Sequence, residues 1–566
     1  MRRDMSENGD NPERKQYEVE LHHDRFGPLG SGVLYFGGNR WAQVNLSISH
    51  SAPELRAGDA KFDLVKAITG EGTTFCLCNC EANGIAIFAD YVIEGDLSKA
   101  EFDLISVRYH DVSEWFLRRR TVDGSVGETL TWRGIPKDID VSVKTDEEHF
   151  DLRSEYFASR NQRGEDLILH EHVEFVFSAK NGQFSLADVK AKAHELSCLF
   201  SILLAYPATI ASVMVSQGGG RFRRVHFPTF ERPERDKGDR GFWAQWFVQQ
   251  PALDGQWQSI FDHYYRSKYR EICWVRLAGM QRYEGFWEYK ALGYVSLLDS
   301  YLAIRFDGVK SPNSQPPSSK KINKFRLRLT SELPTISTEQ RERIIEIASG
   351  AFASDNLNLE GKYRLAIATM DADVAKIINL SDAEFALIKN IRNRVAHGDE
   401  HGLEREQFPR VICAQSKIAL LLTYWAFLDF GLTTQEFITC LASTHSQLKL
   451  ASMIDRVHLD RVTGAAEFFP VTKERLQLLS GIKQLRTHGC CVEDENGDLT
   501  FSEELTQRYS DWMHDGTKPS GIHDPEQIFG VGKDQARFVG QAYFECEDER
   551  LSVHAIWIIK ETSLVK

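Results

Sequence analysis

The stretch SDAEFALIKNIRNRVAHGD, residues 381–399, carries the signals of one amphipathic helix with a polar end. Ser381 and Glu384 have the spacing of a capping box, which predicts that the helix begins there. Apolar side chains recur every three or four positions and predict a buried stripe made of Phe385, Ile388, Ile391 and Val395. Gly398 stands where a left-handed C-terminal cap is expected. The helix therefore ends beside a group of polar residues.

That polar end contains Arg392, Asn393 and His397, residue types that together can cleave RNA without a metal ion. Histidine titrates near neutral pH, so it can move a proton to or from a ribose hydroxyl or a leaving oxygen. Arginine forks onto phosphate and stabilises transition-state charge, and asparagine can orient either group. Attack by the neighbouring 2′-hydroxyl would leave a 2′,3′-cyclic phosphate, and DNA would not be cut. The alternative is a solvated helix end without chemistry.

The helical repeat sets a condition on this site. Arg392 and His397 are five residues apart, which places them about 140° apart around a straight helix. The arginine could swing round, or the last turn could unwind at Gly398. A more economical solution is a homodimer in which two copies of the helix share one cleft, with Ala386, Lys389 and Asn393 along the seam.

Helical periodicity surrounds the motif and predicts a bundle of about five helices between residues 283 and 445. Two of these helices are expected at 338–352 and 362–378, and the apolar segment PRVICAQSKIALLLTYWAFLDFGL is expected to be a central core helix. The densest basic run of this region, KKINKFRLRL, contains Lys320, Lys321 and Lys324. These lysines and Arg394 are candidate RNA contacts, and the alternative is a solvated helix face.

The N-terminal part, residues 17–282, is predicted to be a β-rich domain with one helix at 185–205 capped by Ser185. Short alternating runs indicate antiparallel strands, and residues 1–16 are expected to be a disordered tail. Three cysteines in TTFCLCNC, namely Cys76, Cys78 and Cys80, would share one strand face, as metal ligands or as core. The stretch SQGGGRFRRVHF (216–227) lacks the Lys-Ser/Thr of a nucleotide-binding loop, so a phosphate site competes there with a glycine turn leading into an edge strand.

The C-terminal region, residues 446–566, has a mixed α/β pattern and no function that its sequence indicates. A structural zinc site there is one hypothesis, with candidate ligands His488, Cys490, Cys491, His514, His523, Cys546 and His554. None of these residues has the two-residue cysteine spacing of common zinc sites, so the alternative is no metal. Catalysis at the 392–397 motif is expected to need no metal or cofactor. The whole chain is thus predicted to be an α+β multidomain protein.

Bulk properties limit the classes of function. The chain has 566 residues, a net charge of −13 and ten cysteines without disulfide-scaffold spacing. The acidic charge excludes sequence-blind coating of nucleic acid, so an RNA site must be a local basic patch. No run of eighteen apolar residues and no apolar leader is present, so no membrane span is expected. These features favour a reducing cytoplasm.

The RNRVAH segment within a helical bundle resembles the Arg-Asn-x-x-x-His motif of HEPN ribonucleases. Joined to a β-rich half with the TTFCLCNC strand, it resembles the ApeA family of antiphage HEPN proteins over about residues 17–445. The resemblance implies a dimeric ribonuclease with Arg392, Asn393 and His397 as catalytic residues. It further implies cleavage of tRNA near the anticodon loop, triggered when the N-terminal half senses a phage-encoded protein such as a capsid component. Alternatives are a non-catalytic module that binds RNA or protein, and the toxin of a toxin–antitoxin pair, against which the chain length weighs.

Overall fold

The computed structural model describes residues 14–47, 55, 60–97, 99–124, 129, 131–134, 137–218, 221–233, 242–310, 319–332, 336–353, 357–514 and 524–561. Of the predicted tail, residues 1–13 lie outside the described residues, and Lys15 already begins the first strand. The chain divides into two compact units. The first comprises Met1–Asp371 and Ile378–Ile454, and the second comprises Ala372–Ile377 and Asp455–Lys566.

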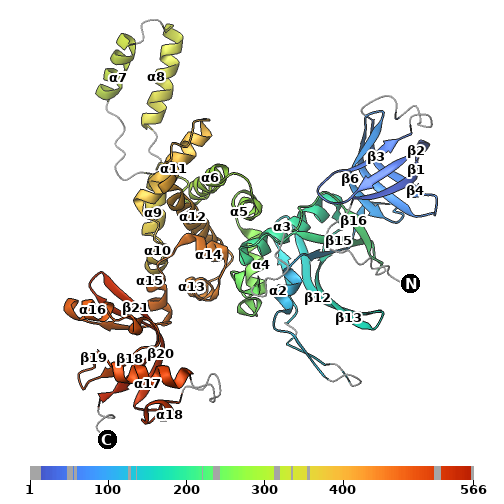
Figure 1. Ribbon diagram of the computed structural model, residues 1–566. Coiled ribbons are helices and arrows are strands. Elements are labelled where there is room, and N and C mark those ends of the chain that lie inside the picture. Colours follow the sequence, from blue (N-terminus) through green and yellow to red (C-terminus); the bar gives the residue numbers. More distant parts are fainter. Residues whose placement is uncertain are drawn as a thin grey trace. The chain divides into compact units, whose positions relative to one another are not determined.

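Strands β1 to β6 form a closed antiparallel barrel, drawn in blue in Figure 1. The strands are β1 (Lys15–His23), β2 (Gly27–Phe36), β3 (Ala42–Leu46), β4 (Ala60–Thr69), β5 (Thr74–Ala82) and β6 (Ala86–Glu94). They pair in the order β6-β3-β2-β1-β4-β5, and β5 also pairs with β6, which closes the ring. Alternate side chains such as Leu21, Leu34 and Val65 fill the interior. The predicted antiparallel start of the chain is confirmed.

The barrel continues into an open sheet through strand β16 (Arg223–His226), which pairs with β6 on one side and β15 on the other. The predicted edge strand is therefore wrong, because β16 is paired on both sides. The open sheet comprises β15 (Ile210–Ser216), β8 (Leu104–Tyr109), β13 (Asp166–Ala179), β12 (His149–Arg163) and β11 (Asp140–Lys144). Short pairs are β7 (Glu101–Phe102) with β14 (Phe184–Ser185), and β9 (Thr121–Asp123) with β10 (Thr131–Arg133).

Helix α3 (Leu186–Leu204) packs on this sheet and begins at a capping box formed by Ser185 and Asp188, which confirms the predicted cap. The Tyr109 hydroxyl on β8 donates to the Ala193 carbonyl at 2.8 Å, so helix and sheet are tied together across the core. The other helices of this part are α2 (Val112–Leu117), α4 (Trp257–Arg266) and α5 (Val275–Arg282).

The alternation of β5 changes at Asn79, and this change separates the three cysteines. Asn79 has a left-handed backbone (φ 53°) and makes no ladder pair with Asp63 opposite it, although the register between β4 and β5 is the same on both sides. Cys80 therefore joins Leu77 in the barrel interior, while Cys76 and Cys78 lie on the other side of the strand. All three thiols are buried and free, and burial raises the pKa of Cys78 to about 12. The prediction of one shared face is wrong because the left-handed backbone at Asn79 reverses the alternation without a change of register.

The helical part contains more helices, among the described residues, than the predicted five. They are α6 (Trp287–Arg305), α7 (Ser319–Glu332), α8 (Thr338–Ala353), α9 (Leu359–Ala368), α11 (Asp382–Ala396), α12 (Phe408–Asp429), α13 (Thr434–Ser443) and α14 (Gln447–Ser452). Helix α12 is the central core helix, as predicted, and Trp425 on it stacks on Tyr301 of α6 with ring centroids 4.9 Å apart. Arg405–Asp429 is long and apolar enough to cross a membrane, but 83% of its apolar window is buried inside the fold.

Two predicted boundaries differ from the structure. The expected helix at 362–378 is split, because α9 ends at Ala368 and α10 spans Ala372–Ile378. The second unit begins at Asp455 and not at residue 446, since α14 packs on α12 and the Cys413 thiol donates to the Ser452 carbonyl at 3.3 Å.

The second unit is a small mixed sheet with helices on both faces. Its elements are α15 (Arg456–Thr463), β17 (Glu467–Pro470), α16 (Lys473–Ser480), β18 (Cys490–Glu493), β19 (Leu499–Phe501), α17 (Glu503–His514), α18 (Pro525–Phe529), β20 (Ala536–Cys546) and β21 (Glu549–Lys560). The strands lie in the order β17-β20-β21-β18-β19. Leu476 of α16 and Cys491 share one core cluster, whereas Tyr509 of α17 and Cys490 share another.

Candidate active site

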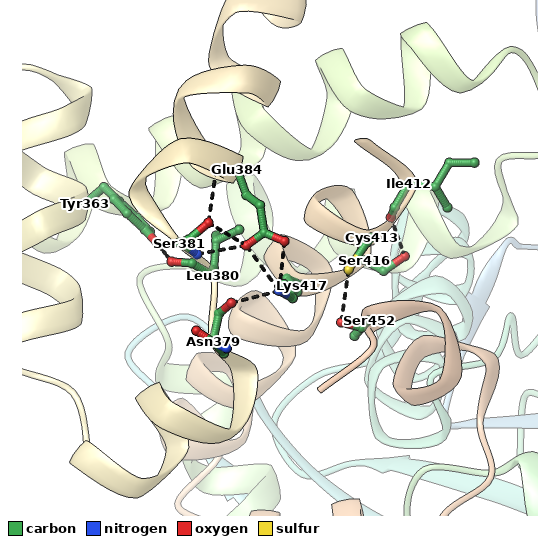
Figure 2. A network of polar contacts seen from close by, with 10 residues as sticks. All are labelled: Tyr363, Asn379, Leu380, Ser381, Glu384, Ile412, Cys413, Ser416, Lys417 and Ser452. Carbon is green, nitrogen blue, oxygen red and sulfur yellow. Dashed lines mark hydrogen bonds and ion pairs between the residues drawn. The ribbon is translucent and has the colours of Figure 1, made fainter. Parts of the chain in front are cut away.

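The start of α11 is locked to the core helix α12 by a buried ion pair (Figure 2). The Ser381 N–H donates to Glu384 at 2.8 Å and the Glu384 N–H donates to the Ser381 hydroxyl at 3.2 Å, which confirms the predicted capping box. The Lys417 ammonium, whose side chain is 7% exposed, lies 2.9 Å from Glu384 and 2.7 Å from the Asn379 carbonyl. The N-terminal turn of α11 therefore has both a local cap and a tertiary anchor.

Charge pairing keeps this buried carboxylate ionised. Burial acts to raise the pKa of Glu384, but the Ser381 backbone and hydroxyl and the Lys417 ammonium outweigh it and lower that pKa below the ordinary 4.5. A folded-state pKa below the unfolded value means that Glu384 stabilises the fold above about pH 4.5, and that this contribution is lost as the pH falls through the folded-state pKa.

One face of α11 is buried as its sequence predicts. Phe385, Ile388 and Ile391 are at most 2% exposed, and Val395 is half-buried. The Phe385 ring stacks on Tyr363 of α9 with centroids 3.9 Å apart. This packing fixes the rotation of the helix and turns its polar residues away from the core.

Arg392 reaches two oxygen atoms at the edge of that polar face. Its Nη1 donates to Asn393 Oδ1 at 3.1 Å, and its Nη2 lies 3.5 Å from Asp299 Oδ2 on α6. The two charged side chains are 30% and 38% exposed, so solvent and ligands can reach the pair. The guanidinium of Arg392 is thus held between Asn393 and Asp299.

Asp299 is a site residue that the sequence analysis missed. It is an acidic residue within the otherwise apolar run VSLLDSYLAI of α6, and that isolated charge was the available signal. Its pairing with Arg392 joins residues 93 positions apart and could not be read from periodicity.

His397 forms the C-terminal cap of α11, with its side chain exposed. Its backbone N–H donates to the carbonyls of Asn393 at 3.2 Å and Arg394 at 3.0 Å. Gly398 follows with φ 78°, which confirms the predicted end of the helix. Asn393 and His397 are one turn apart, so they belong to the same face of the helix. The motif therefore presents an amide paired with a guanidinium, followed by a solvent-accessible imidazole.

The loop after the helix packs against Arg394. The Nη1 of Arg394 donates to the His401 carbonyl at 3.5 Å. A Cβ atom built at Gly402 (φ +64°) would lie only 1.9 Å from the same nitrogen, so the guanidinium occupies the space of a side chain at this position. The His401 ring in turn contacts Trp287 and Phe408, with ring centroids 5.3 and 5.6 Å away. Arg394 is exposed, yet its contacts fasten the loop beside the candidate site.

Comparison with known families finds a match in the N-terminal half of the chain. Residues 31–264 match the family model of ApeA N-terminal domain 1. These residues are similar to an ApeA N-terminal domain. The match spans the open sheet and most of the barrel and supports an ApeA-like antiphage protein. No curated protein and no solved structure matches the chain.

The basic run predicted to contact RNA lies outside the matched residues 31–264, on helix α7. Lys320 and Lys324 are exposed there, and the Lys321 side chain lies outside the described residues. Helices α7 and α8 lie side by side in Figure 1, and Arg326 pairs with Glu342 across them at 3.2 Å. These contacts hold the helical pair together and do not connect the lysines with α11.

The candidate zinc ligands lie in the second unit. Within the described residues no three His, Cys, Asp or Glu side chains are grouped so that they could hold a metal ion, and His523 lies outside those residues. Cys490 and Cys491 occupy different core clusters, and burial raises the pKa of each to about 12. Adjacent strand residues point to opposite faces, so these two thiols do not face one ion.

Proposed function

We propose that this chain is an antiphage ribonuclease that cleaves RNA, with tRNA anticodon loops as the expected substrate, in the cytoplasm of an infected bacterium. The observation that carries the proposal is an ApeA N-terminal domain in one chain with a helix that ends in Arg392, Asn393 and an exposed His397. An acidic chain of net charge −13 favours a local RNA site over indiscriminate degradation.

The proposed reaction needs a base, an acid and a group that stabilises charge on phosphate. His397 takes the proton from the ribose 2′-hydroxyl, whose oxygen attacks the adjacent phosphorus. The bond from phosphorus to the 5′-oxygen breaks, and a protonated His397 imidazole gives a proton to that oxygen as it leaves. The products are a 2′,3′-cyclic phosphate and a 5′-hydroxyl. Arg392 stabilises the negative charge of the transition state, and phosphate would compete with Asp299 for its guanidinium.

A shared cleft in a homodimer is supported by the surface of α11. Ala386, Asn390, Asn393 and His397 are all exposed, and their spacing places them in one stripe along the helix. Small and polar side chains allow two such helices to approach around a two-fold axis. Lys389, predicted for the same seam, instead pairs with Glu360 of α9 at 2.7 Å, so Asn390 replaces it in the proposed contact.

The N-terminal half is proposed as the sensor of a phage-encoded protein, such as a capsid component. The alternative of a non-catalytic binding module has one observation in its favour, because Asp299 already neutralises Arg392. In an enzyme, the phosphate of the RNA must displace the Asp299 carboxylate from Arg392. A module that binds protein can keep the Arg392–Asp299 pair intact. Cleavage assays distinguish the two functions.

We expect tRNA from phage-infected cells that express the wild-type chain to be cut, and the fragments to end in 2′,3′-cyclic phosphate. The measurement is end-group analysis of total tRNA, compared between wild type and His397→Ala. Purified full-length protein should cut the same RNA in EDTA, because the proposed chemistry uses only side chains. Activity that disappears in EDTA and returns with Mg²⁺ would contradict this mechanism.

We also expect partial recovery when His397→Ala subunits are mixed with Arg392→Ala subunits. If each site takes its histidine and its arginine from different chains, random mixing restores about one quarter of the wild-type sites. The control is each variant alone at the same total concentration. Full activity from a species that light scattering identifies as a monomer would rule out the shared cleft.

A further inference from the structure

The barrel carries a hollow on its outer surface, away from the bundle motif. It has a volume of about 530 Å³ and lies over strands β4, β5 and β6, next to the start of β3. Asn79, with its left-handed backbone, lines the hollow, and the residues on either side of it, Cys78 and Cys80, pair with Tyr91 and Ala89 of β6. The register thus leaves Asn79 opposite Asp90.

Three polar side chains cross the floor of this hollow in one row. The β4–β5 register leaves Asp63 opposite Asn79 in the same way, so the amide stands between two carboxylates. Asn79 Nδ2 donates to Asp90 Oδ2 at 3.3 Å. The next row holds Lys61 and Glu81, which form an ion pair at 2.5 Å. Among the residues that line the hollow, three carboxylates and one ammonium therefore leave an excess of two negative charges.

Two aromatic rings border the same hollow and stay exposed to solvent. Trp41 is 52% exposed and Phe88 is 39% exposed, although both belong to a well-packed barrel. The Lys190 ammonium lies 5.5 Å from the Trp41 ring centroid, so this ring already attracts a cation from within the chain. Exposed aromatic rings beside carboxylates form the chemical environment that arginine and lysine side chains prefer at protein interfaces.

We propose that this hollow binds an arginine or lysine side chain on a partner protein, and that it is the contact through which the N-terminal domain recognises its trigger. The proposal rests on the sensing role given above and adds the place and the chemistry of recognition. The two excess carboxylates repel phosphate, so nucleic acid is not the occupant. A guanidinium would stack on an exposed ring and donate to Asp63 or Asp90.

The test uses the full-length chain and a fluorescein-labelled peptide that carries three arginines spaced by glycine and serine. A matched peptide replaces each arginine with citrulline, which keeps the shape and removes the charge. We expect fluorescence anisotropy to show tighter binding of the arginine peptide. The double variant Asp63→Asn with Asp90→Asn, and separately Trp41→Ala, should each weaken that binding about tenfold.

The matched control is Glu18→Gln with Glu20→Gln, two exposed carboxylates on β1 of the same barrel. Equal weakening by this control, or equal binding of the citrulline peptide, would overturn the proposal by showing only general attraction to an acidic protein. Binding does not depend on RNA cleavage, so His397→Ala should bind as the wild type does, and a failure of the ribonuclease proposal would be seen separately. Phage defence that persists in the Asp63→Asn, Asp90→Asn variant would overturn the trigger role.

Discussion

The His397→Ala variant is expected to lose RNA cleavage by ~10²–10⁴-fold, the usual effect of removing a proton-transfer group. The imidazole is exposed at the C-terminal cap of α11 and packs against no core residue, so its removal should leave the fold unchanged. The helix cap is kept because it depends on the backbone N–H groups of residues 397 and 398. The measurement is the initial rate of tRNA cleavage by the purified variant, alongside its thermal unfolding midpoint.

His445→Ala is the matched control, because His445 is also exposed and also follows the end of a helix in the same bundle. It should cleave at the wild-type rate. A second variant, Arg392→Ala, should be as inactive as His397→Ala if both groups act on one phosphate. Near-normal cleavage by either motif variant, with the fold intact, would show that the motif is not the active site.

The Lys417→Met variant is expected to lower the free energy of unfolding by about 3 kcal/mol. The reason is that the substitution leaves the Glu384 carboxylate buried without its cation. The Asn379 carbonyl loses its ammonium donor in the same change. Because Glu384 also caps α11, the first turn of that helix should open more often. Urea unfolding measures the global effect, and hydrogen exchange over residues 381–388 measures the local one.

Two comparison variants separate charge burial from simple loss of a lysine. Lys389→Met removes a cation that pairs with Glu360 near the surface, and it should have a much smaller effect. Adding Glu384→Gln to Lys417→Met removes the unpaired charge and should recover part of the stability. An equal loss for Lys389→Met and Lys417→Met would show that burial of the Glu384–Lys417 pair contributes nothing.

Local signals in the sequence determined the elements that the candidate site is built on. The ends of α11 follow from Ser381, Glu384 and Gly398, because caps depend on residues three or four positions apart. Its buried face follows from the spacing of Phe385, Ile388 and Ile391, since the helical repeat alone decides which side chains share a side. The antiparallel strands were predicted from their two-residue alternation, and the core helix was predicted from its continuous apolar run.

Tertiary structure alone decided how those elements are joined and what surrounds the motif. Asp299 meets Arg392 from 93 residues away, and Lys417 meets Glu384 from 33 residues away, so neither pairing has a period or a spacing in the sequence. The left-handed backbone of Asn79 arises between two neighbouring strands, and this residue both divides the cysteines and lines the hollow on the barrel. Caps and periodicity are properties of consecutive residues, whereas ion pairs and strand register arise only when distant segments pack together.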